Sequence, residues 1–181
     1  MLGQQTVEEV HELDGTTSSS LLGATLSQAR DVLYLVGGAD PKATRTEDPW
    51  LKVRCVSFTQ GDGRVWSPDC ENEGVVNRRG HAAYSIQDAL YVFGGEDSQS
   101  NTLESTDAAE LSARGLKWTS LDGVGPSSRS WAGHCVVAGT NSRDVGLVHG
   151  GRNGQSLMDD VWVLDPHQSP AWAKLATKGP K

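Results

Sequence analysis

The sequence predicts an all-β protein made of three repeated units, each with four short strands. The first observation is a double glycine that occurs three times and closes a short apolar run each time. The second is its period, because 57 residues separate Gly37 from Gly94 and 56 separate Gly94 from Gly150. The third is a composition with 21 glycines, which suits many tight turns between short strands. A β-rich run that ends in two glycines at a nearly constant period indicates a repeat architecture.

The second strand of each unit is the clearest, because it is the apolar run that directly precedes the glycines. The runs 32–36, 89–93 and 145–149 end at the pairs Gly37-Gly38, Gly94-Gly95 and Gly150-Gly151. Glycine allows positive φ and a close backbone approach at a strand end, so we interpret the pairs as structural markers. A phosphate-binding role is disfavoured, because no Gly-x-Gly-x-x-Gly or Gly-x-x-x-x-Gly-Lys pattern accompanies them.

Three further strands complete each unit. First strands are expected at 21–26, 81–85 and 134–138, and third strands at 51–58, 106–111 and 160–165. Residues 103–114 also fit a short helix by composition, but the repeat context favours a strand. A tryptophan segment closes each unit, with Trp66, Trp118 and Trp172 expected to pack between neighbouring units.

These boundaries divide the chain into two parts. Residues 1–15 form an N-terminal segment that we interpret as a stray outer strand, because 12–15 resembles 120–123, which closes the second unit. The repeat domain is expected to span 16–181, with units of about 16–70, 75–123 and 127–178. Both ends resemble cuts in a continuing pattern.

Composition disfavours several classes of function. The formal net charge is −7 and the longest basic run is Arg78-Arg79, whereas phosphate-backbone binding needs clustered Lys and Arg. The three cysteines form no Cys-x-x-Cys pair, and no histidine or cysteine spacing fits a metal site. We therefore expect no metal, no cofactor and no nucleic acid. The absence of a signal-peptide pattern and of a long apolar run predicts no membrane contact and a cytoplasmic location.

The repeated residues resemble the kelch repeat. The resemblance rests on the double glycines, the closing tryptophans and the strand 161–165. It also rests on the arginine, glycine and histidine that precede or begin the first strand of the second and third units. The resemblance covers about 18–178 and implies a β-propeller in which each unit is one four-stranded blade. Three blades fall short of a closed ring of about 4–8, so we expect an incomplete ring, completed by further blades or by self-association.

Candidate partner-binding residues follow from this resemblance. In several kelch propellers the arginine before the innermost strand lies on the face that binds partner peptides, and the loops after the double glycines lie beside it. By motif position the candidates are Arg78, Arg79, Arg129, Glu96, Asp97, Arg152 and Asn153. Trp131 is a further candidate because it stands at a loop-to-strand junction, and exposed tryptophan is a common interface anchor; partial burial under a loop is the alternative. An equally weighted alternative is that the arginines anchor the strand entrances by hydrogen bonds to nearby backbone. His81 and His134 are interpreted as equivalent structural residues.

The leading functional hypothesis is a non-enzymatic scaffold or adaptor that binds a protein partner through loops on one propeller face. Two alternatives remain open. One is a propeller-type metal-dependent enzyme, an oxidase or a specifier-like protein, although no Gly-x-Ser-x-Gly nucleophile pattern occurs. The other is a structural subunit of a larger assembly, in which neighbours cover the outer blade faces.

Overall fold

The computed structural model describes residues 22–29, 32–40, 53–57, 65–66, 70–71, 77–112, 115–139 and 143–176. These residues form fifteen β-strands and no helix, which confirms the all-β prediction. None of their segments is a helix long and apolar enough to cross a membrane. The predicted segment 1–15 lies outside the described residues.

Three antiparallel four-stranded sheets repeat along the chain, and we call them blades 1, 2 and 3. Blade 1 contains β1 (Thr25–Ala29), β2 (Val32–Val36), β3 (Val53–Ser57) and β4 (Val65–Trp66). Blade 2 contains β6 (Ala82–Ile86), β7 (Ala89–Phe93), β8 (Thr106–Ser112) and β9 (Gly115–Leu121). Blade 3 contains β10 (Gly133–Ala138), β11 (Asp144–His149), β14 (Val161–Leu164) and β15 (Trp172–Leu175). The sheets do not close on one another, so the described part is an incomplete propeller.

Two short elements depart from the simple repeat. β5 (Cys70–Glu71) pairs in parallel with β9 of blade 2, although these residues adjoin the predicted end of the first unit. β12 (Arg152–Asn153) and β13 (Ser156–Leu157) form a hairpin in the loop after the third double glycine. Residues 106–112 are a strand, because β8 pairs with β7 on one side and β9 on the other.

Two hydrophobic cores lie between the blades. The first contains Trp118 of blade 2, which is fully buried, together with Val36 and Val53 of blade 1. The second contains Trp172 of blade 3, which packs with Phe93 of blade 2 at a ring-centroid distance of 5.0 Å. Trp118 and Trp172 thus each fill the gap to the preceding blade, and a large ring supplies much of such a small core.

The second glycine of the first two pairs makes a backbone contact between blades. Gly38 N–H donates to the Arg78 carbonyl oxygen at 2.8 Å, and Gly95 N–H donates to that of Arg129 at 2.8 Å. Gly95 has φ +93°, and a Cβ atom there would lie 2.9 Å from the Arg79 carbonyl oxygen. The glycines therefore provide the close backbone approach that their spacing predicts.

Strand register corrects the predicted equivalence of the two histidines. Ala82 pairs with Phe93 in blade 2 and Gly133 pairs with His149 in blade 3, so Gly133 corresponds to Ala82. His134 therefore corresponds to Ala83, two residues beyond His81. The two histidines also differ in environment, since His81 is buried and His134 is exposed.

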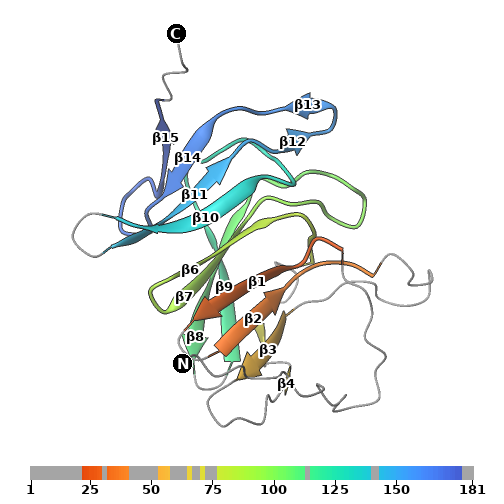
Figure 1. The fold of residues 1–181 in the computed structure, drawn as a ribbon, viewed down its shortest axis with the longest axis vertical. Coiled ribbons are helices and arrows are strands. Elements are labelled where there is room, and N and C mark those ends of the chain that lie inside the picture. Colours follow the sequence, from red (N-terminus) through yellow and green to blue (C-terminus); the bar gives the residue numbers. More distant parts are fainter. Residues whose placement is uncertain are drawn as a thin grey trace, which may run out of the picture.

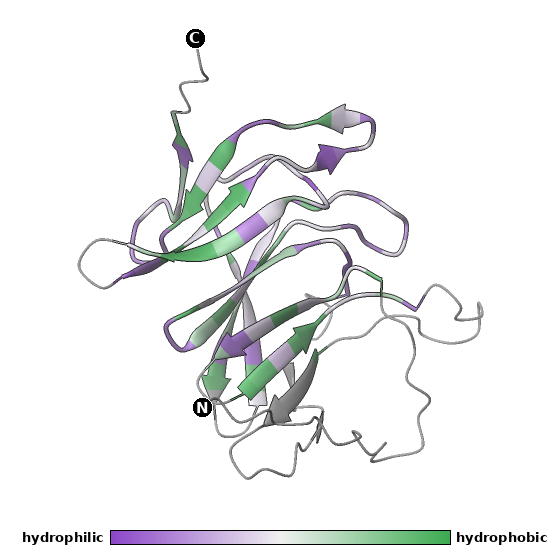
Figure 2. Ribbon diagram, in the orientation of Figure 1, coloured by the Kyte–Doolittle hydropathy of each residue, from purple (hydrophilic) through white to green (hydrophobic). Residues whose placement is uncertain are grey.

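In all three blades the described residues that follow the double glycines lie on one side, at the right of Figure 1. We call this side, with residues 37–40, 94–105, 122–132 and 150–160, the loop face. Figure 2 shows that hydrophobic residues gather in the strands, while β12 on this face is hydrophilic. Blade 2 lies between the other two, so β6 is mostly buried, whereas most residues of β10 in blade 3 are exposed.

Candidate protein-binding face

Backbone bridges fix the loops of the loop face to the entrances of the inner strands. Arg79 and Glu96 exchange two backbone hydrogen bonds of 3.1 and 2.9 Å, and Ser130 and Arg152 exchange two of 2.9 Å. The residue after the double glycine is thereby tied to the residue before the inner strand of the same blade. This pairing brings side chains that are distant in sequence to one place.

The carboxylate of Glu96 is the centre of that place. Its Oε2 accepts a hydrogen bond of 3.3 Å from Arg79 Nε. Its Oε1 accepts three more, from Ser130 Oγ at 2.9 Å, Trp131 Nε1 at 3.1 Å and Arg152 Nη2 at 3.1 Å. We call these five residues the Glu96 cluster. Four of the predicted site residues therefore converge, and Ser130 is an addition that the sequence did not single out.

The cluster keeps Glu96 ionised although the side chain is buried. Burial alone would raise the pKa of the carboxyl group, since it disfavours the charged form. The hydrogen bonds from Ser130, Trp131 and Arg152 outweigh burial and lower the pKa below its ordinary value. Glu96 is therefore a fixed negative charge that orients two arginines and an indole ring.

Trp131 is held in an unusual backbone conformation. Its φ is +58°, and the equivalent positions in the other blades are Gly23 and Gly80, with φ +74° and +62°. The indole ring lies over Gly80, because a Cβ atom added there would be 2.7 Å from Trp131 Cε2. The residue is nevertheless 42% exposed. A bulky residue at positive φ is a rare outlier, and such strain concentrates at functional sites.

Arg78 and Arg129 have another role, because their guanidinium groups are buried. Arg129 is 1% exposed and donates to the Gly150 carbonyl oxygen at 3.0 Å and to Asp160 Oδ1 at 2.6 Å. Arg78 is 3% exposed and makes the same pair of contacts one blade earlier, to the Gly94 carbonyl oxygen and to Asp107. Arg78 is thus the counterpart of Arg129, and both guanidinium groups anchor the first glycine of their own blade.

The carboxylates that receive these arginines were missed by sequence reasoning. Hydrogen bonding from Arg129 lowers the pKa of Asp160 well below its ordinary range, with Trp162 as a second donor. Burial lowers the pKa of Arg78, while Asp107 acts in the opposite direction. The sequence feature that could have identified them is an aspartate at the start of the third strand in the second and third units.

The two remaining candidates shape the loops. Asp97 accepts hydrogen bonds from the backbone N–H groups of Gln99 and Asn101 at 2.8 and 2.9 Å, and the Asn101 side-chain amide lowers its pKa. Asn153 joins two loops, because it accepts from Thr102 Oγ1 at 2.8 Å and donates to Ser128 Oγ at 2.9 Å. The face is therefore an ordered surface.

No group of three or more His, Cys, Asp and Glu side chains is placed to hold a metal ion within the ranges that the structure describes. His81 is buried, and burial lowers its pKa to about 3. It accordingly stays neutral, with Nε2 2.7 Å from Thr25 Oγ1, which is a packing contact between blades 1 and 2.

Comparisons with known proteins agree with this architecture. Residues 5–181 match the family model described as the KLHDC2/KLHL20/DRC7 Kelch-repeats domain. The chain is 26% identical over 131 residues to the Rab9 effector protein with kelch motifs of Bos taurus, covering 71% of this chain and 32% of that protein. The corresponding protein of Gallus gallus is 29% identical over 135 residues, covering 73% and 33%.

A plant relative carries a different name. The acyl-CoA-binding domain-containing protein 4 of Arabidopsis thaliana is 28% identical over 104 residues, which is 58% of this chain and 15% of that protein. The chain spans about a third of the length of the Rab9 effector relatives that it matches. The match to the family model covers nearly all of the sequence. The chain belongs to the kelch-repeat family.

Proposed function

We propose that this chain is a non-enzymatic interaction module that binds a partner protein through its loop face. The observation that carries the proposal is Trp131, an exposed indole held at positive φ by a hydrogen bond to a buried carboxylate. Exposed tryptophan and arginine side chains are the residues that most often dominate binding at protein interfaces. Here Trp131, Arg79 and Arg152 all donate to the same carboxylate, that of Glu96.

The proposed contact set is Trp131, Arg79, Arg152 and Asn153. The side chains of Arg79 and Arg152 are 29% and 51% exposed, and each retains guanidinium N–H groups beyond those bonded to Glu96. Planar guanidinium groups suit recognition of a carboxylate. Arg78 and Arg129 are not in the set, because their guanidinium groups do not reach the surface.

The relatives suggest one partner to test first. Several of them carry the name Rab9 effector protein with kelch motifs, so we propose a Rab-type small GTPase as the first candidate. The measurement is retention of Rab9, loaded with a GTP analogue or with GDP, on the immobilised chain. Retention of the GTP-analogue form alone supports an effector role, and equal retention of both forms, or of neither, contradicts it.

Variants of the loop face test the site itself. Trp131→Ala and Arg152→Ala should weaken partner capture at least tenfold, because truncation of a central interface residue costs about 2 kcal/mol or more. Arg143→Ala is the matched control, since Arg143 is exposed in the turn between β10 and β11, at the opposite end of the strands. Equal capture by all three variants would show that the loop face is not the binding site.

The non-enzymatic part of the proposal has its own measurement. Purified protein should contain no stoichiometric copper, iron or zinc by elemental analysis. Stoichiometric metal that survives dialysis would favour the metal-dependent enzyme instead.

We also propose that another blade covers the exposed face of blade 3. Trp131 N–H of blade 3 donates to the Gly80 carbonyl oxygen of blade 2 at 2.7 Å, and Gly80 N–H donates to the Gly23 carbonyl oxygen of blade 1 at 2.8 Å. The same backbone hydrogen bond therefore links each of these blades to the preceding one. The next blade would come from a second copy or from further polypeptide. Light scattering across a concentration series distinguishes the two, because only the second copy requires a dimer of 19.3 kDa chains.

A further inference from the structure

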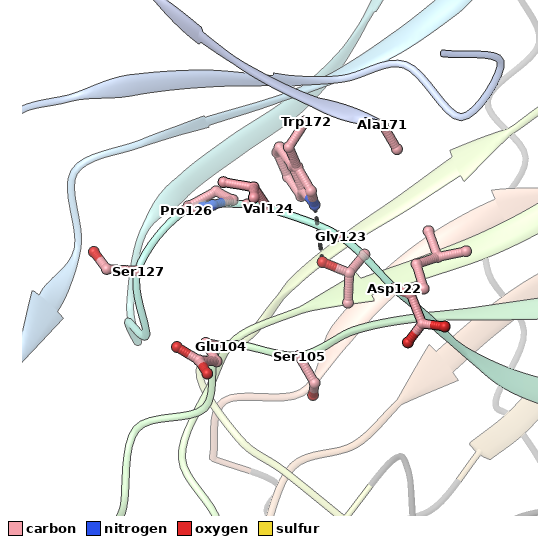
Figure 3. A pocket seen from close by; sticks show the side chains of 12 residues that line it. Glu104, Ser105, Asp122, Gly123, Val124, Pro126, Ser127, Ala171 and Trp172 are labelled. Carbon is pink, nitrogen blue, oxygen red and sulfur yellow. Dashed lines mark hydrogen bonds between the residues drawn. The ribbon is translucent and has the colours of Figure 1, made fainter. Parts of the chain in front are cut away.

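A cavity of about 520 Å³ opens on the loop face between blades 2 and 3 (Figure 3). Its walls come from three segments, which are Glu104 to Thr106, the linker Leu121 to Ser127, and Ala171 to Trp172. The volume lies within the range of about 300–1,000 Å³ that is usual for ligand sites. None of the five residues of the Glu96 cluster lines it, so the cavity is a separate feature of the same face.

The charge of the lining is negative. Glu104 and Asp122 are both exposed, and neither forms a hydrogen bond or an ion pair with any residue that the structure describes. No lysine, arginine or histidine lines the cavity. Two uncompensated carboxylates at one cavity favour a cationic occupant, and the overall charge of −7 has the same sign.

The remaining lining is mixed. The hydroxyl groups of Ser105, Thr106 and Ser127 line it, together with apolar or aromatic side chains that include Val124 and Trp172. Trp172 is held in place by a hydrogen bond of 2.8 Å from its Nε1 to Thr106 Oγ1. In Figure 3 its ring lies at the top of the cavity, with Glu104 and Ser105 below it and Asp122 to the right. Val124 is 75% exposed beside it. An aromatic ring attracts a nearby cation, and an exposed aliphatic side chain can cover the methylene stem of a long basic residue.

We propose that this cavity binds a lysine or arginine side chain from a segment of the partner protein. The charged head lies between Glu104 and Asp122, and the methylene stem packs on Val124 and the ring of Trp172. The inference rests on the proposed function, because it takes the ligand to be part of a bound protein. It adds a second chemistry, since the Glu96 cluster presents arginines while the cavity accepts a cation.

The test uses defined peptides and the whole chain. The probe is acetyl-Val-Arg-Val-amide, and the comparison peptide replaces arginine with citrulline, which has the same shape without the charge. The readouts are the nuclear magnetic resonance shifts of the Trp172 indole N–H and the Gly123 amide. We expect saturable shifts with the arginine peptide, weaker shifts at high salt, and none with the citrulline peptide. Equal shifts with both peptides would overturn the proposal.

Matched variants identify the carboxylates. Glu104→Gln and Asp122→Asn should each weaken peptide binding about threefold, and the double variant about tenfold, as expected for exposed ion pairs. Asp159→Asn is the control, because Asp159 is an exposed acid on the same face that does not line the cavity. Unchanged affinity in the double variant, or the same loss in the control, contradicts the assignment.

The outcomes separate this inference from the proposed function. If Trp131→Ala abolishes partner capture while the cavity double variant changes neither capture nor peptide binding, the cavity assignment is wrong and the interaction function stands. If the double variant loses peptide binding while Trp131→Ala and Arg152→Ala capture the partner normally, the cavity assignment stands and the Glu96 cluster is not the contact surface.

Discussion

Replacing Arg129 with methionine should destabilise the protein far more than the same change at Arg152. The Arg129 guanidinium is buried and donates to Asp160, to the Gly150 carbonyl oxygen at 3.0 Å and to the Ser127 carbonyl oxygen at 3.1 Å. Methionine fills much of the space of the arginine stem but donates nothing. The substitution therefore removes the guanidinium donor from two carbonyl oxygens and from the Asp160 carboxylate.

The magnitude follows from what Asp160 retains. Removing one partner of a buried ion pair costs about 3–5 kcal/mol. The Asp160 side chain is 18% exposed and keeps Trp162 Nε1 at 2.8 Å and Lys174 Nζ at 3.5 Å, so the lower limit applies. A loss of about 3 kcal/mol lowers the melting temperature by about 6–12 °C in a chain of this size.

The assay is thermal unfolding followed by circular dichroism, with Arg152→Met as the control. The Arg152 side chain is 51% exposed and makes one ion pair with Glu96, so its loss should cost less than about 1 kcal/mol. The double variant Arg129→Met with Asp160→Ala should be more stable than Arg129→Met alone, because it removes a carboxylate that has lost its shortest ion pair. Equal melting temperatures for the two single variants would refute the assignment of Arg129 as a blade anchor.

Three further predictions concern other residues of the blades. Burial lowers the pKa of His81 to about 3, below its unfolded value of about 6.5, so the unfolded chain binds one more proton between these pH values. Stability should then fall as pH falls, and His81→Asn should reduce the slope by up to about 1.4 kcal/mol per pH unit in urea titrations; an unchanged slope would contradict this. Gly95→Ala should destabilise the protein by more than about 1 kcal/mol, because φ is +93° and the added Cβ would lie 2.9 Å from the His81 Cβ. Gly133→Ala is its control and should be neutral or stabilising, since that Cβ would meet nothing closer than 3.8 Å. Gly80→Ala should displace the ring of Trp131, visible as a shift of its indole resonance, and an unmoved resonance would argue against the stacked position.

The strand pattern was predictable because it depends on local sequence. An apolar run followed by two glycines fixes the second strand and its end, and residues 32–36 and 89–93 form β2 and β7 with these bounds. The first strand of blade 1 was predicted less accurately, since it was expected at 21–26 and lies at Thr25–Ala29. No double glycine defines its end, so its position depends on pairing with β2.

The error in aligning the histidines has a physical cause. Gly80-His81 and Gly133-His134 are identical dipeptides, and identity suggested equivalence. Register in an antiparallel pair is set by the hydrogen-bonded partner strand and not by the dipeptide. The third blade has Trp131 where the second has Gly80, so the glycine that looks equivalent lies two residues farther into the inner strand.

Backbone geometry also decides which candidate arginines reach the surface. Arg78 and Arg79 are adjacent, and successive side chains of an extended segment point to opposite sides. Arg78 consequently enters the blade and pairs with Asp107, while Arg79 remains 29% exposed beside Glu96. Motif position identified the pair but not which member reaches the surface, because that depends on which side the core occupies.

Trp131 connects the fold with the proposed function. Blades 1 and 2 have glycine at this position, which accommodates positive φ without strain, and the repeat alone requires nothing larger in blade 3. A tryptophan there costs backbone strain and leaves a large apolar ring 42% exposed. The hydrogen bond to Glu96 and the stacking over Gly80 hold the ring in one orientation, so less side-chain freedom is lost when a partner binds. Strain that the fold does not need, at an ordered and exposed aromatic residue, is the strongest reason to look for the binding surface at this position.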